Sequence, residues 1–197
     1  MGVIRVLGRR FLTSRYFAWA VRGLRRLFGL SGVCHLVALA PGCLVGPMLR
    51  ALGGRIDGTV NFTGPVRIVD ARGDLSNLEI RGPAWLGTGI VFDLTDAISI
   101  GEGASIGWDV KMFTHFDTGN HNELGRWFPA TTGPLRIGPH CFISSQSLLF
   151  PGICLGARTL VGSNSVVRES TPGDCVVVGV PARVVRRLEP RMAPCSE

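Results

Sequence analysis

The sequence predicts an all-β solenoid, a parallel β-helix built from six-residue repeats. Two observations lead there: hydrophobic residues recur every six positions in the second half, and glycine makes up 27 of 197 residues, about twice its usual share. Because 46% of the chain is hydrophobic, so much glycine indicates tight turns between short strands rather than disorder. The length allows one main domain and a small appendage.

The period of six is clearest in the second half, where it runs through six repeats without a slip. Its positions are Ile137, Ile143, Leu149, Leu155, Val161 and Val167. Earlier runs are Ile80, Leu86 and Phe92, and then, two residues out of step, Leu94, Ile100, Ile106 and Met112. An α-helix cannot keep every sixth residue on one face, whereas a short strand followed by a corner can. Stacked coils would then bury these side chains in one continuous core.

Residues 1–57 are predicted to form a basic, apolar, helical segment ahead of the β-helix. Apolar side chains recur there at helical spacing, for example at Val21, Leu24 and Phe28. Up to residue 56 the chain has nine arginines and no acidic residue, and the remainder is close to neutral. This charge suits an anionic membrane surface or an acidic saccharide. We expect no nucleic acid, because no nucleic-acid-binding module follows.

The run from Leu27 to Leu49 has no charged side chain and is long enough to cross a bilayer, but glycines and prolines interrupt it. Three arrangements stay open for it: attachment to a membrane surface, packing against the main domain, and a span. The run starts too late for a signal peptide. The six cysteines form no C-x-x-C pair and suit free thiols. We therefore expect a cytoplasmic protein, peripheral on the inner face of the membrane if the segment attaches.

Several segments resemble the hexapeptide-repeat acyltransferases: IGEGASIG (100–107), IGPHCFIS (137–144) and LGARTLVGSNSVV (155–167). The resemblance covers about residues 58–188 and implies a left-handed β-helix. Residues 171–188 resemble the exit of that family into a short C-terminal helix, which leaves residues 189–197 as a tail. The family also implies acetyl-CoA as acyl donor, no metal, and a homotrimer with its sites between neighbouring subunits.

The predicted chemistry centres on residues 113–135, where the repeat stops and then resumes in register. A long excursion between rigid coils is more often functional than accidental. It opens with Thr114-His115-Phe116-Asp117, and in the resembled family the histidine of a T-H-x-D motif is the general base. A neutral imidazole can take the proton of a sugar hydroxyl as that oxygen attacks a thioester. His115 is therefore the predicted base.

Other site residues are assigned less directly. His121 ends a T-G-x-H form (118–121) and is the alternative base; otherwise, it belongs with Asp117 to the acceptor site. Asp93 is predicted to orient the acceptor or the base, with Asp96 as its rival. By motif position, the residues expected to hold the coenzyme are Ser145, Ser163, Arg168, Arg183 and Arg186, the last two through its phosphates. Phe142 replaces a tryptophan frequent in the family, which weakens the case for an adenine contact there.

The predicted function is transfer of an acetyl or other short acyl group from acetyl-CoA to a hydroxyl of a sugar or polysaccharide precursor. N-acetylation of an amino sugar is the nearest alternative. A zinc enzyme like the γ-carbonic anhydrases shares the fold, but it needs three converging histidines, for which His115, His121 and His140 are the candidates. A non-catalytic scaffold is the third alternative, and the inserted loop with its histidines and aspartates argues against it.

Overall fold

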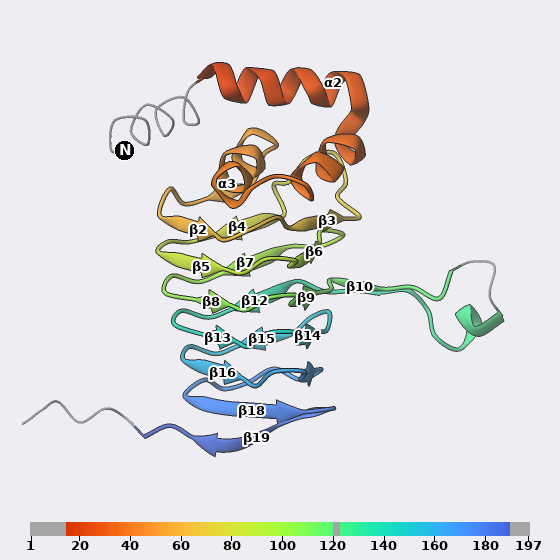
Figure 1. The fold of residues 1–197 in the computed structure, drawn as a ribbon. Helices are drawn as coiled ribbons and strands as arrows, with labels where there is room; N and C mark the ends of the chain where they lie inside the picture. Colours follow the sequence, from red (N-terminus) through yellow and green to blue (C-terminus); the bar gives the residue numbers. More distant parts are fainter. Residues whose placement is uncertain (1–14, 120–122, 190–197) are drawn as a thin grey trace, which may run out of the picture.

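The computed structural model describes residues 15–119 and 123–189, which form a parallel β-helix with helices at one end (Figure 1). Each coil contributes one strand to each of three sheets. The first three coils are β1 (Arg55–Ile56), β2 (Val60–Phe62) and β3 (Arg67–Val69); β4 (Leu78–Ile80), β5 (Ala84–Leu86) and β6 (Val91–Asp93); and β7 (Ile98–Ile100), β8 (Ser105–Ile106) and β9 (Lys111–Met112). The next two are β12 (Leu135–Ile137), β13 (Phe142–Ile143) and β14 (Leu148–Leu149), then β15 (Cys154–Leu155), β16 (Thr159–Val161) and β17 (Val166–Val167).

The three sheets run the length of the solenoid. The first sheet is β1-β4-β7-β12-β15, the second is β2-β5-β8-β13-β16-β18-β19, and the third is β3-β6-β9-β14-β17. The residues at the six-residue period point inward and are buried, as at Ile106, Ile143 and Leu155. The predicted fold class, a β-solenoid of hexapeptide repeats, is confirmed. Its left hand, which the family resemblance implies, stays a prediction.

Coil length varies at one corner of the β-helix, where the chain passes from the third sheet to the first. Ile137 pairs with Leu155, 18 positions on, whereas Ile80 pairs with Ile100, 20 positions on. The two extra residues explain the break in the period after Phe92. Ile100 in turn pairs with Ile137, 37 positions on, because the long excursion leaves the β-helix at this same corner.

The predicted short C-terminal helix is wrong within the described residues. Residues 175–187 form an antiparallel hairpin of β18 (Cys175–Gly179) and β19 (Ala182–Arg187), which extends the second sheet. β18 contains three consecutive valines and β19 contains two, and β-branched residues favour strand over helix. Gly179 adopts a φ of +105° at the turn, which suits glycine. Residues 190–197 lie outside the described part of the chain.

The N-terminal helices cover the open end of the core. α2 (Arg15–Val37) and α3 (Gly42–Ala51) lie across the first coil (Figure 1). Val33, Val37 and Leu49 are fully buried and belong to the same core as the β-helix. Through these buried side chains the run from Leu27 to Leu49 packs against the main domain, which is one of the three arrangements that the sequence left open. No helix within residues 15–119 and 123–189 is long and apolar enough to cross a membrane.

Candidate active site

The excursion leaves the β-helix as a two-stranded ribbon that projects from the solenoid (Figure 1). Its strands are β10 (His115–Phe116) and β11 (Thr131–Thr132), which pair antiparallel, and the 3₁₀ helix η1 (Glu123–Arg126) lies further out. At the base, the Gly133 N–H donates to the Thr114 carbonyl at 2.9 Å, and the Gly152 N–H donates to the Gly133 carbonyl at 3.1 Å. A Cβ on Gly133 would lie 2.7 Å from the Gly152 Cα. The ribbon is therefore fixed tightly to the next coil.

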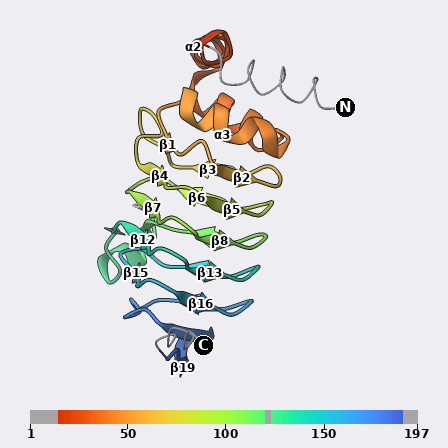
Figure 2. The same cartoon turned by 90° about the vertical axis from the view of Figure 1, so that its left-hand side faces the viewer.

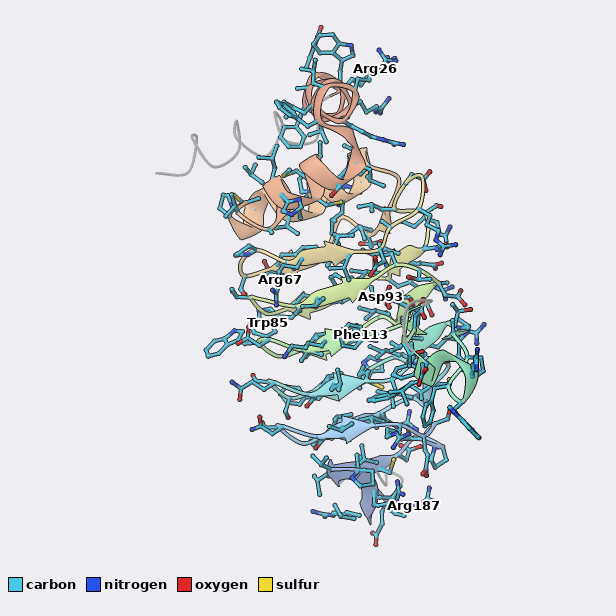
Figure 3. The ribbon with its side chains drawn as sticks, turned by 90° about the vertical axis from the view of Figure 1, so that its right-hand side faces the viewer. Arg26, Arg67, Trp85, Asp93, Phe113 and Arg187 are labelled. Atoms are coloured by element: carbon cyan, nitrogen blue, oxygen red, sulfur yellow. The ribbon has the colours of Figure 1, made fainter. Side chains whose placement is uncertain are left out.

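Asp93 lies directly under the start of the ribbon, at the end of β6, and has no exposed surface. One carboxylate oxygen, Oδ1, accepts from the Thr95 N–H at 3.0 Å and the Thr95 hydroxyl at 2.9 Å. The other, Oδ2, accepts from the backbone N–H groups of Thr114 and His115 at 2.8 and 3.0 Å. Figure 3 shows Asp93 near Phe113, on the side from which the ribbon leaves. Asp93 thus joins two successive coils at the start of the ribbon.

The same carboxylate holds the imidazole of His115. The Nδ1 atom of His115 lies 2.7 Å from Asp93 Oδ2 and 3.0 Å from the Thr95 hydroxyl oxygen. A carboxylate can only accept hydrogen bonds, so we assign the proton of the neutral ring to Nδ1. Nε2 is then left with a free lone pair. The pairing of a buried carboxylate with the predicted base gives this ring the form that a general base requires.

Hydrogen bonding, rather than burial, decides the charge of Asp93. Burial by itself would raise the pKa of this carboxyl, but hydrogen bonds from the Thr114 and Thr95 N–H groups and from the His115 and Thr95 side chains outweigh it. The pKa of Asp93 therefore lies below its ordinary value. The group is ionised at neutral pH and accepts a hydrogen bond from the Nδ1–H of His115.

Thr95 is a member of this group that the sequence analysis missed. Its hydroxyl contacts both the Asp93 carboxylate and the His115 ring. The available signal was the sequence Asp-Leu-Thr at the end of a strand, because an aspartate often accepts from the backbone two residues on. Asp96, the alternative to Asp93, forms hydrogen bonds within the corner. Its N–H donates to the Thr114 hydroxyl, and its Oδ1 accepts from the Ala97 N–H.

A cleft of about 300 Å³ opens beside His115. Its walls are Phe113, His115, Phe116, Asp117, Leu148, Phe150 and Pro151. Apart from the imidazole and Asp117, this lining is apolar. Asp117 accepts from the Gly119 N–H at 2.7 Å. A larger hollow of about 790 Å³ lies near Arg158, Asp174 and Arg187, but no histidine lines it. We therefore take the smaller cleft, which the predicted base lines, as the candidate active site.

The residues predicted to hold the coenzyme lie in three places. Arg168 stacks over the ring of Phe150, 5.1 Å from its centroid, and Phe150 lines the cleft. Ser145 and Ser163 occupy equivalent corners of successive coils, between the second and third sheets. Arg183 and Arg186 are exposed on β19, and Arg183 pairs with Glu169 at 3.0 Å. His121, the alternative base, lies outside the described residues.

One group of side chains could in principle hold a metal ion. Among residues 15–119 and 123–189, only Asp70, Asp93 and His115 bring three ligand atoms within 4.8 Å of one another. The group contains a single histidine, and the Asp93 oxygens already accept the five contacts described above. His140, the third histidine weighed for a zinc site, is exposed at the corner between β12 and β13.

Comparisons with known proteins agree with this picture. The chain is 28% identical over 139 residues to the putative colanic acid biosynthesis acetyltransferase WcaF of Escherichia coli, covering 71% of this chain and 72% of that protein. It is 32% identical over 104 residues to the galactoside O-acetyltransferase of E. coli, covering 52% of this chain and 49% of that protein. No family model matches.

Solved structures give the same result for the fold. A hexapeptide-repeat acetyltransferase from Vibrio cholerae, solved with acetyl-CoA, superposes with a TM-score of 0.69 at 21% identity. The match covers 85% of this chain and 90% of that chain. The resemblance predicted from the repeats is thereby confirmed.

The lowered pKa of Asp93 predicts a pH-dependent contribution to stability. An aspartate whose folded pKa lies below the unfolded value of about 3.9 stabilises the fold above that value. The contribution is lost as the pH falls through the folded pKa. Asp93→Asn should therefore lower the Tm at pH 7, and the difference from the wild type should shrink progressively below about pH 4.

Thermal unfolding of both proteins between pH 2 and 7 measures this difference. Glu102→Gln, on an exposed corner, is the control for loss of one carboxylate and should keep the wild-type Tm at pH 7. A gap between wild type and Asp93→Asn that stays constant over the whole range would contradict the ionised, hydrogen-bonded carboxylate.

Proposed function

We propose that this chain, a relative of the hexapeptide-repeat acyltransferases in sequence and fold, transfers an acetyl or other short acyl group from acetyl-CoA to a hydroxyl of a sugar or polysaccharide precursor. The observation that carries this proposal is an imidazole held by a buried carboxylate at an apolar cleft. The enzyme class and the acyl donor rest on the relatives. The base and the acceptor rest on the site.

The reaction would proceed by direct transfer. Nε2 of His115 accepts the proton of the acceptor hydroxyl while the oxygen of that hydroxyl attacks the thioester carbonyl. Asp93 stabilises the imidazolium that forms, because it accepts from Nδ1 and is ionised. As the tetrahedral intermediate collapses, the new C–O bond remains and the C–S bond breaks. The sulfur of the coenzyme leaves and takes the proton from Nε2, which restores the neutral ring.

A carbohydrate acceptor fits the lining of the cleft. Phe113, Phe116 and Phe150 present apolar ring surfaces on which the C–H face of a sugar could pack. Asp117, at the same cleft, offers carboxylate oxygens to hydroxyl groups. Two of the relatives are named for colanic acid biosynthesis and for O-acetylation of galactosides. Both names support a carbohydrate acceptor, and the second supports a hydroxyl over an amine.

The coenzyme is proposed to reach the cleft along the third sheet. Arg168 contacts Phe150 of the cleft and could contact a phosphate or the pantetheine arm. Ser145 and Ser163 lie at the other edge of this sheet and are proposed to contact the pantetheine arm. Arg183 pairs with Glu169 at the surface, where such pairs contribute little. Arg183 could therefore exchange this partner for a phosphate of the coenzyme, as could the nearby Arg186.

We also propose that the active form is a homotrimer. The cleft is partly open and on its own would cover a coenzyme poorly, whereas a neighbouring subunit would close it. Light scattering should give about three times the chain mass of 21.1 kDa. A monodisperse, active monomer would contradict this assembly.

Replacement of His115 tests the proposed base. His115→Ala should lower kcat by about 10²–10⁴ at saturating acetyl-CoA, because removal of a general base has this effect. The affinity for acetyl-CoA should stay nearly unchanged, since the imidazole acts on the acceptor in the transition state. The melting temperature should show that the variant is folded. Steady-state kinetics with one acceptor and direct binding of labelled acetyl-CoA give the two readouts.

His121→Ala is the matched comparison, because His121 comes from the same loop. It should cost less than His115→Ala and act mainly through the KM of the acceptor. A folded His115→Ala enzyme with near-normal kcat would overturn the assignment. An inactive His121→Ala enzyme beside it would make His121 the base.

A further inference from the structure

The outer arm of α2 exposes an apolar stripe that the catalytic proposal does not use. This arm runs from Arg15 to Phe28 and ends at Gly29, where a φ of +70° interrupts the helix. Tyr16, Trp19 and Leu27 are 79%, 75% and 78% exposed. With about 3.6 residues per turn, positions 16, 19 and 27 fall on one side of a helix. Such a set of large exposed apolar side chains marks an interaction surface.

The opposite side of the arm packs onto the protein. Val21 is buried, and Phe17 and Leu24 are partly buried against the core. The Arg25 guanidinium donates to the Gly73 carbonyl at 2.6 Å. These contacts fix the rotation of the helix, so that the stripe faces away from the β-helix. Figure 2 shows α2 as the outermost described element at this end, beyond α3.

Three arginines flank the stripe. Arg15, Arg22 and Arg26 are exposed, and their spacing places them together beside Trp19 on the helix. Figure 3 shows Arg26 at the outer end of the molecule. The first 56 residues contain nine arginines and no acidic residue. No carboxylate of this segment therefore balances their charge.

We infer that this basic-aromatic face, made of Tyr16, Trp19, Leu27, Arg15, Arg22 and Arg26, binds the surface of an anionic lipid bilayer. The helix would lie in the plane of the interface, with its apolar stripe at the level of the headgroups and acyl chains. Tyrosine and tryptophan are enriched at that depth. Arginine side chains can extend from there to lipid phosphates.

Charge complementarity favours a bilayer over a second copy of the chain. Two copies that met through this face would bring their arginines together, and neither α2 nor α3 contains an acidic residue. Like charges at an interface are unfavourable. An anionic surface has the opposite charge and also an apolar layer for Trp19 and Leu27. It therefore satisfies both parts of the face.

This orientation leaves the cleft in water. The β-helix extends away from α2 (Figure 2), and adjacent strands are about 4.8 Å apart. His115 leaves the third coil, so it would lie on the order of 10 Å beyond the first coil. The acyl transfer site and the membrane face are thus separate. The inference about α2 does not depend on the proposed reaction.

Sedimentation of the full-length protein with lipid vesicles tests the electrostatic part. The wild type should bind vesicles of phosphatidylcholine with 30% phosphatidylglycerol (about one anionic lipid in three), but not phosphatidylcholine alone. Binding should weaken with salt, since charges are screened within about 10 Å at 0.1 M. The variant R15Q/R22Q/R26Q should bind about 100-fold more weakly. R72Q/R136Q/R187Q removes the same charge from exposed sites elsewhere and should lose far less.

The double variant W19S/L27S tests the apolar part. It should bind anionic vesicles at least about tenfold more weakly with an unchanged Tm, because both side chains are exposed. V180S/V185S removes exposed apolar side chains at the far end and should bind normally. Equal binding of the wild type to neutral and anionic vesicles, or no binding to either, would overturn the inference. A smaller particle mass of W19S/L27S by light scattering would also overturn it, since the face would then join copies of the chain.

Discussion

The register of the stacked coils is the constraint on which the rest of the structure depends. Each inward side chain must lie over its equivalent in the next coil, as Ile80, Ile100 and Ile137 do in the first sheet. A coil can therefore gain residues only where the chain turns between sheets. The extra residues of the second and third coils lie at the same corner of the β-helix, between the third sheet and the first. Two irregularities, one short and one long, are thus stacked on each other.

The chemistry of the site follows from this stacking. The short irregularity places Asp93 and Thr95 beneath the start of the long one, which begins with Thr114 and His115. A buried carboxylate is unfavourable unless donors surround it. Here the corner and the ribbon supply those donors from backbone that the register already fixes. The imidazole is therefore held in one orientation, which the proposed proton transfer requires.

The sequence predicted the fold, since the six-residue period has no other simple explanation. It also placed the break after Phe92, but it did not separate Asp93 from Asp96. A regular coil of 18 residues, as between Ile137 and Leu155, would put Ala97 under His115, next to Asp96. The observed coil has 20 residues, so Thr95 lies there and Asp93 is its hydrogen-bond partner. The prediction of a C-terminal helix is wrong for a different reason. It was drawn from the family resemblance, whereas the valines of β18 and β19 favour strands.

The central claim is that Asp93 acts on the reaction through His115, and a double-mutant cycle tests it most directly. We would measure kcat for the wild type, Asp93→Asn, His115→Ala and the double variant, each shown to be folded, with one sugar acceptor at saturating acetyl-CoA. If the two residues act as one unit, the double variant should be about as slow as His115→Ala alone. Losses that multiply in the double variant would contradict the account, because Asp93 would then contribute independently of the imidazole.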